Sequence, residues 1–361
     1  MLSMVSCLEE DELFCHLLHD EGKRRRQRSL PRPALCNPTM SQWAMLCGPD
    51  IDQALIATTG FDHHAFRMLL AKFKPWFETH APWVGLQDGA CFAPLNPNRS
   101  KGGRKRVVSA EACLGLVLSS YRFRGAEFIL QGWFGFTGSH CNVWLRFGRR
   151  GLIALLWGDD AASIKMPTAD KIAQLCQLTN NRHNMLTDVC CVADGLKLLF
   201  QTDGNLGEQS VFHNGWTHDH HMTNLFPFST DGHIVHALID APGSLHDSSL
   251  ATWGGFCDTL EEVFTRTGGK SCVDSPFATN EAPCLIKSAQ CPPGGEDARD
   301  ILQLQQATSF RQAAEWGMGA IQSAFPKMKD RIKIEENGER RVVLHLLPLL
   351  YNCRLEHVGL N

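Results

Sequence analysis

The chain has 361 residues, of which 43% are hydrophobic and 20% are charged, and its formal net charge is −3 at pH 7. This length and composition fit one large or two ordinary globular domains and exclude a disordered chain. The nearly neutral charge excludes a wholly basic nucleic-acid coat protein, while local basic patches remain compatible with it.

The cysteines indicate reduced thiols. There are 15 of them, an odd number with scattered spacing, and Cys190 and Cys191 stand in an apolar run. This pattern favours free thiols over a disulfide scaffold. The first residues lead directly into Glu9, Glu10 and Asp11 instead of a signal peptide, and no apolar run reaches membrane-spanning length. We therefore expect an intracellular protein without a membrane span.

Residues 1–58 are predicted to form a poorly ordered N-terminal segment. It contains a basic run at residues 23–28, followed by Pro31, Pro33 and Pro38. Such a run serves as a nuclear address or as an arm that touches DNA, and a solvated tail explains it equally well. Location in the nucleus is therefore a hypothesis.

Residues 59–165 are predicted to form an all-helical, helix-turn-helix-like region that binds DNA. Helical patterns cover residues 61–75, 109–121, 126–133 and 139–156, with Pro75 as a stop and Gly125 and Gly138 at turns. A small helical bundle that only braces the next domain is the alternative. The candidates for DNA contact are the basic residues Arg104, Lys105, Arg106, Arg146, Arg149 and Arg150.

The pattern changes at about residue 185, where short apolar runs rich in β-formers alternate with helical stretches. Such a mixture predicts an α/β domain over residues 185–361, with a mixed sheet flanked by helices. The predicted strands are 189–193, 209–212, 225–228, 234–239 and 271–273, and the predicted helices are 248–267, 304–328 and 341–354.

Three carboxylates stand out within this domain. Asp194 and Asp274 each end an apolar strand candidate, where a charge is costly unless it binds something and where ligands gather in α/β sheets. Glu315 lies in the long helix, one turn after Arg311. Together they could form the oxygen-rich site that Mg²⁺ or Mn²⁺ prefers, and two such ions activate phosphodiester displacement. A helix cap or an arginine pair explains any single carboxylate equally well.

Four segments resemble PIF/Harbinger-type transposases, which are DDE superfamily endonucleases, and they occur in that family's order. Residues 192–197 are similar to the first-aspartate motif and residues 273–277 to the second. Residues 241–248 are similar to the Pro-Gly-Ser-x-His-Asp-Ser signature, and residues 309–317 to the Arg-x-x-x-Glu segment. The resemblance covers roughly residues 60 to 361.

The resemblance implies an RNase H-like core in which Asp194, Asp274 and Glu315 are the catalytic metal ligands of a metal-dependent endonuclease. It implies two Mg²⁺ or Mn²⁺ ions, a DNA substrate and a separate DNA-binding partner protein, and it leaves a homo-oligomer open. Departures at Gly319 and Cys353, and an end at Asn361 before the family's sheet domain ends, leave an alternative open. In that alternative the chain is a decayed or domesticated relative that binds DNA or protein without cutting.

Four further residues are accessory candidates. Asp247 is a rival for the second metal position, although capping of the following helix explains it better. His218 and Asn214 are candidates for a loop that touches phosphate. Arg311 could neutralise phosphate, and an i,i+4 ion pair with Glu315 explains it equally well.

Overall fold

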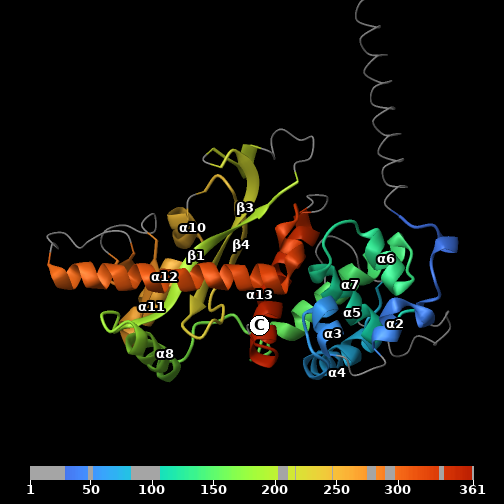
Figure 1. Cartoon of the computed structure of the whole chain (residues 1–361), viewed down its shortest axis with the longest axis horizontal. Helices are drawn as coiled ribbons and strands as arrows, with labels where there is room; N and C mark the ends of the chain where they lie inside the picture. Colours follow the sequence, from blue (N-terminus) through green and yellow to red (C-terminus); the bar gives the residue numbers. More distant parts are fainter. Residues whose placement is uncertain are drawn as a thin grey trace, which may run out of the picture. The chain divides into compact units, whose positions relative to one another are not determined.

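The structure, a computed structural model, divides into two compact units, residues 1–148 and 149–361 (Figure 1). It describes residues 29–47, 52–82, 106–201, 210–215, 217–245, 247–274, 282–288, 297–332 and 337–359, without the side chains at 247, 248 and 337. The predicted basic run at residues 23–28 lies outside these residues. The division between the units falls inside helix α7 (Gly138–Leu156).

The first unit is built from helices. The stretch for which the sequence predicted little order contains short helices from residue 32 onward. The elements are η1 (Arg32–Ala34), η2 (Pro38–Met40), α2 (Gln42–Leu46), α3 (Asp52–Thr59), α4 (His63–Thr79), α5 (Ala110–Arg122), α6 (Phe128–Phe134) and the first part of α7.

Helix α4 continues past Pro75, where the sequence predicted its end. Asp62 caps the helix by accepting a hydrogen bond from the Ala65 amide at 2.7 Å. Phe66 and Phe73 are buried along one face and Phe77 continues that face beyond the proline. Their packing outweighs the single backbone hydrogen bond that a proline cannot donate.

The second unit contains a six-stranded mixed sheet in the order β2-β3-β1-β5-β6, and β4 also pairs with β3. Strand β1 is antiparallel to β3 and parallel to β5, and β5 is parallel to β6. Residues 210–212 are helical, so the strand predicted there is wrong over those residues. The strands are β1 (Val189–Leu199), β2 (His213–Asn214), β3 (Asp219–Ser229), β4 (Leu238–Pro242), β5 (Lys270–Val273) and β6 (Leu285–Lys287).

Helices cover both faces of this sheet. The long helix α12 (Ala298–Ala324) runs across one face, as Figure 1 shows, and packs on β1, β3, β5 and β6. On the other face, α8 (Ala169–Arg182) and α11 (Phe256–Thr267) form a hydrophobic core with the sheet. The remaining elements are α10 (Asp247–Trp253), η3 (Pro326–Lys329) and α13 (Asn337–His357).

The helix predicted over residues 248–267 is divided into α10 and α11. Gly255 has a left-handed backbone with φ 69°, which a side chain rarely adopts. A Cβ atom at Gly254 would lie 2.7 Å from a methyl carbon of Leu238, so the chain also passes close to β4 there. The pair of glycines therefore ends one helix and begins the next.

Two glycines of the family-like segments are required by close packing. A Cβ atom at Gly243 would lie 2.1 Å from the His221 carbonyl oxygen and 2.7 Å from that of Phe212. A Cβ atom at Gly317 in α12 would lie 2.8 Å from the ring of Phe228 in β3. Gly243 lets the segment after β4 approach β3, and Gly317 lets α12 lie close to the sheet.

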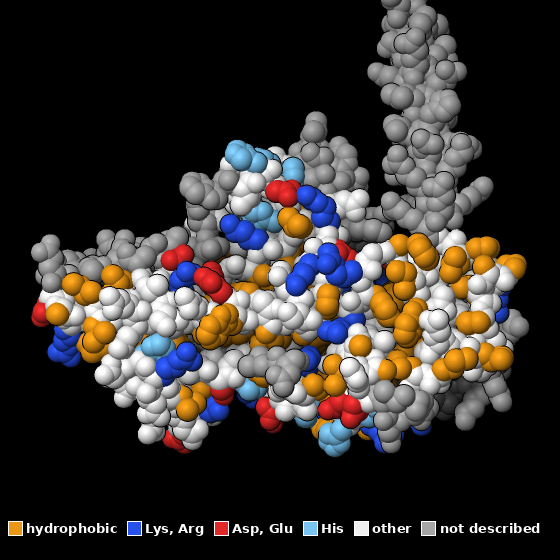
Figure 2. Space-filling view, viewed as in Figure 1, with side chains coloured by type: hydrophobic (Ala, Val, Ile, Leu, Met, Phe, Trp, Pro, Cys, Tyr) orange, Lys and Arg blue, Asp and Glu red, His pale blue; other side chains and the backbone are white. Residues whose placement is uncertain are grey.

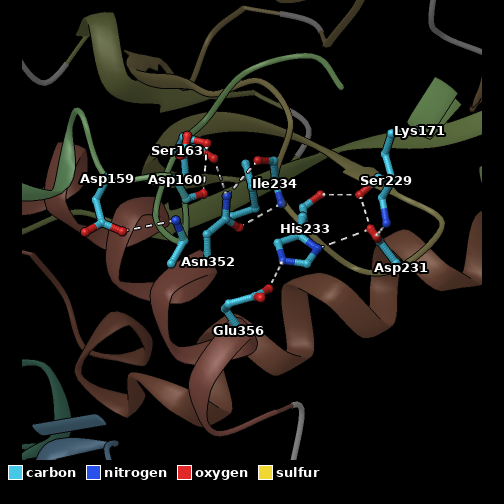
Figure 3. A network of polar contacts seen from close by, with 11 residues as sticks. Asp159, Asp160, Ser163, Lys171, Ser229, Asp231, His233, Ile234, Asn352 and Glu356 are labelled. Carbon is cyan, nitrogen blue, oxygen red and sulfur yellow. Dashed lines mark hydrogen bonds and ion pairs between the residues drawn. The ribbon is translucent and has the colours of Figure 1, made fainter. Parts of the chain in front are cut away.

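An ion-pair network joins the end of β3 to two helices (Figure 3). Asp231 accepts hydrogen bonds from Lys171 of α8 at 2.8 Å, from Ser229 at 2.6 Å and from His233 at 3.2 Å. The other ring nitrogen of His233 lies 3.3 Å from Glu356 of α13. Burial alone would raise the pKa of Asp231, but these hydrogen bonds outweigh burial and lower it.

The same network makes the stability of the second unit depend on pH. The hydrogen bond to Asp231 raises the pKa of His233 above its ordinary value, although burial opposes this. Since the folded pKa lies above the unfolded one, the stabilisation is fully present below the unfolded pKa and is lost as pH rises through the folded pKa.

We expect His233→Gln to lower the melting temperature at pH 5.5 by about 2–4 °C, which is what a loss of about 1 kcal/mol produces in a domain of this size. At pH 9 the loss should be smaller, because His233 of the wild type is then neutral. Thermal unfolding at both pH values checks this, with the exposed His213→Gln as control. An equal loss at both pH values would contradict a charged His233.

Candidate functional site

Asp194 lies inside β1, and Asp274 is the residue that follows the neighbouring parallel strand β5. Val192 of β1 pairs with Cys272 of β5, and each aspartate lies two residues further along. Side chains alternate across a strand, so Asp194 shares the face of Val192. The Cys272 thiol donates a hydrogen bond to the Ala307 carbonyl of α12 at 3.4 Å. Asp194 therefore belongs to the face of the sheet that α12 covers, in agreement with its contact with Arg311 of that helix.

Arg311 joins Asp194 to Glu315. One terminal nitrogen of its guanidinium lies 3.7 Å from Oδ2 of Asp194, and the other lies 3.0 Å from Oε1 of Glu315. The i,i+4 pair expected between Arg311 and Glu315 is thus present, and the contact with Asp194 across to the sheet is additional. The side chains of Asp194 and Arg311 are each 22% exposed, and that of Glu315 is 54% exposed.

Two of the three carboxylates, those of Asp194 and Glu315, contact the guanidinium of Arg311 from either side. Asp274 follows the last residue of the adjacent strand β5. Oδ1 of Asp194 also accepts a hydrogen bond from the Gly195 amide at 2.8 Å, which fixes the direction of the carboxylate. Within the described residues, no three His, Cys, Asp or Glu side chains are grouped closely enough to hold a metal ion. The donor types themselves, carboxylate oxygens, suit Mg²⁺ and Mn²⁺.

Asn214 holds a turn next to the segment that follows β4. Its side-chain amide donates a hydrogen bond to the Gly243 carbonyl at 2.6 Å, and its Oδ1 accepts one from the Thr217 amide at 3.1 Å. His218 is exposed in the same turn, with a left-handed φ of 51°. Asp247 is the first residue of α10, and its side chain lies outside the described part of the structure.

The basic residues before α5 divide into two groups. Arg104 and Lys105 lie outside the described residues. Arg106 donates hydrogen bonds to the carbonyl oxygens of Phe77 and His80, and its guanidinium lies 4.9 Å from the centre of the Phe77 ring. These contacts fasten Arg106 to the end of α4, so its donors are engaged within the protein.

The arginines of α7 are less exposed than the sequence suggested. Arg146, Arg149 and Arg150 are all half-buried. Arg150 forms an ion pair with Glu339, near the start of α13. On the face drawn in Figure 2, Lys, Arg and His side chains lie together with acidic side chains over β3.

A buried ion pair lies beside β4 and was not found by sequence reasoning. The Asp240 side chain is 3% exposed and that of Arg340 is 5% exposed, with Arg340 donating two hydrogen bonds to the carboxylate at 2.7 and 3.0 Å. The guanidinium also lies 5.3 Å from the ring centres of Phe200 and Phe212. Asp240 has a left-handed φ of 58°, which is unusual for a residue with a side chain. No local sequence pattern signals a pair between residues so far apart in the chain.

The segment that contains Asp194, Asp274 and Glu315 matches a known family. Residues 193–352, less than half of the chain, match the family model described as DDE superfamily endonuclease. The match begins next to Asp194 and includes Asp274 and Glu315. The comparison with curated proteins and the comparison with solved structures found no match.

The sequence also predicted the absence of a membrane span and the presence of free thiols. None of the described helices is both long and apolar enough to cross a membrane. The cysteines of the described residues are free thiols, and most of them are partly or fully buried.

Proposed function

We propose that the second unit cuts phosphodiester bonds of DNA with two bound Mg²⁺ or Mn²⁺ ions held by Asp194, Asp274 and Glu315. The observation that carries the proposal is the geometry of these residues. Helix α12 brings Glu315 to the same arginine that contacts Asp194 of β1, and Asp274 directly follows the neighbouring strand β5. The family match over the same segment supports it.

The sheet supports an RNase H-like assignment for this unit. Its central strand β1 has an antiparallel neighbour on one side and a parallel neighbour on the other, and helices cover both faces. Asp194 lies on this central strand and pairs with Phe226 of β3, two residues after the last pair of β1 with β5. A rigid strand suits a metal ligand, because the ligand must stay in place during the reaction.

Each carboxylate has a distinct task in this proposal. Asp194, fixed by the Gly195 amide, and Asp274, at the strand end, would hold the metal ions from the sheet. The more exposed Glu315 would complete the site from α12. All three must be ionised to do so. The bound ions would supply an activated water or 3′-hydroxyl and stabilise the departing oxygen.

DNA would be held by basic side chains outside the carboxylate cluster. The helices α5, α6 and α7 support a helix-turn-helix-like role for residues 59–165. Helix α6 is followed by Gly135, whose left-handed φ is 68°, and α7 begins three residues after this glycine. The assignment to the PIF/Harbinger type, a separate DNA-binding partner and location in the nucleus rest on the sequence motifs. They form part of the same proposal.

A nicking assay tests the proposed function. Supercoiled DNA that carries the terminal repeats of the transposable element implied by the family resemblance is incubated with the full chain and Mg²⁺ or Mn²⁺. We expect nicked product that disappears with a chelator and with Asp274→Ala. DNA binding without nicking would favour the decayed or domesticated alternative. Equal cleavage by the wild type and Asp274→Ala would show that the activity comes from elsewhere.

A further inference from the structure

The guanidinium of Arg311 occupies the space between two proposed metal ligands. One of its terminal nitrogens lies 3.7 Å from Asp194 and the other lies 3.0 Å from Glu315. A single positive charge therefore contacts both carboxylates. The shorter contact is within hydrogen-bond distance, and the longer one is an ion pair. Because Arg311 and Glu315 are one helical turn apart, α12 itself sets the position of the cation.

The charges in this region need compensation when no metal is bound. The Asp194 side chain is 22% exposed, and Glu315 contacts the same guanidinium, so two carboxylates are held at one cation. Like charges at short range raise the free energy of the folded state. An arginine stays protonated at all ordinary pH values, so Arg311 supplies a permanent compensating charge.

We propose that Arg311 is an internal counter-ion that competes with divalent metal for Asp194 and Glu315, and thereby weakens metal binding. The inference rests on the proposed function. A metal ion shared by the two carboxylates lies about 2.1 Å from each oxygen, which leaves no room for a guanidinium between them. Arg311 must therefore leave this position when the ion binds. Its side chain is 22% exposed, so it has access to solvent to move into.

Mn²⁺ titration of the full chain by calorimetry tests the proposal. Arg311→Met keeps most of the length of the side chain and removes its charge, and we expect it to bind Mn²⁺ about tenfold more tightly than the wild type, a factor that corresponds to 1.4 kcal/mol. Arg311→Lys keeps the charge without the fork that spans two carboxylates, so its affinity should be intermediate. Arg299→Met, an exposed arginine on the same helix, should bind like the wild type.

Thermal unfolding adds a second measurement. Without metal, Arg311→Met should melt below the wild type, because the carboxylates are then uncompensated. Mn²⁺ should raise its melting temperature more than that of the wild type. If Arg311→Met does not fold, Arg311→Lys still carries the test, through its tighter Mn²⁺ binding.

The outcomes separate this inference from the proposed function. Equal or weaker Mn²⁺ binding by folded Arg311 variants would overturn the counter-ion role, even if the wild type binds and cuts. Absence of Mn²⁺ binding in all variants, or binding that Asp274→Ala leaves unchanged, would overturn the proposed metal site and the inference with it. Binding by Arg311→Met alone would support the inference in its strongest form.

Discussion

Asp194→Asn is expected to reduce metal-dependent DNA cleavage by at least about 10³-fold. A metal ligand of this kind contributes several kcal/mol to stabilisation of the transition state, and each 1.36 kcal/mol is a factor of ten in rate. Asparagine keeps the shape of the side chain and an oxygen that can accept from the Gly195 amide, so the local structure should persist. The loss should therefore appear in the cleavage rate and leave DNA binding unchanged.

Initial rates of nicking and fluorescence anisotropy with labelled DNA measure the two effects separately. Asp188→Asn is the matched control, because Asp188 immediately precedes β1, is 53% exposed and pairs with Lys270 away from the site. It should cut DNA at the wild-type rate. A cleavage rate for Asp194→Asn above a tenth of the wild-type rate would remove Asp194 from the metal site.

Arg340→Met is expected to destabilise the second unit by about 3–5 kcal/mol, the usual cost of breaking a buried ion pair at one partner. The substitution leaves the Asp240 carboxylate, which is only 3% exposed, without its two hydrogen bonds from Arg340. It also removes the guanidinium that lies over Phe200 and Phe212. The melting temperature should fall by about 10 °C or more.

Arg341→Met provides the matched control for this experiment. Arg341 contacts the same carboxylate at 3.2 Å but is 68% exposed, so its loss should cost less than about 1 kcal/mol. Adding Asp240→Asn to Arg340→Met should restore part of the lost stability, because the buried charge is then gone. Equal unfolding curves for the two arginine variants would show that burial does not set the strength of this pair.

The elements with long or strongly patterned sequences could be predicted from the sequence. Strands β1 and β5 and helices α12 and α13 lie where apolar runs and helical periodicity placed them, although the observed bounds differ by several residues. Strand β6 was not predicted, because its three residues carry too little pattern. Helix α8, with 14 residues, was not predicted either. Whether such elements form is determined by their packing against the rest of the unit.

Some features of the candidate site could be predicted from the sequence, and others depend on the folded structure. The sequence predicted that both aspartates end a strand. This is wrong for Asp194, which lies inside β1 because the strand continues to Leu199, and it is confirmed for Asp274, which follows β5. Glu315 depended on the family resemblance, because a glutamate one turn from an arginine is common in helices. The contact between Arg311 and Asp194 depends on where α12 lies over the sheet, which no local pattern specifies. The ion pair of Asp240 with Arg340 connects residues 100 positions apart.

This ion pair also has a consequence for the order in which the chain can fold. On the ribosome, Asp240 emerges long before Arg340, so β4 carries an uncompensated charge until nearly the whole second unit has been made. Asn352 acts in the same direction, because its side-chain amide bonds both backbone groups of Ile234, 118 positions earlier, at 2.9 Å. Strand β4 and the segment before it therefore complete their packing only after α13 has been synthesised, and folding of this unit is delayed until its last helix is available.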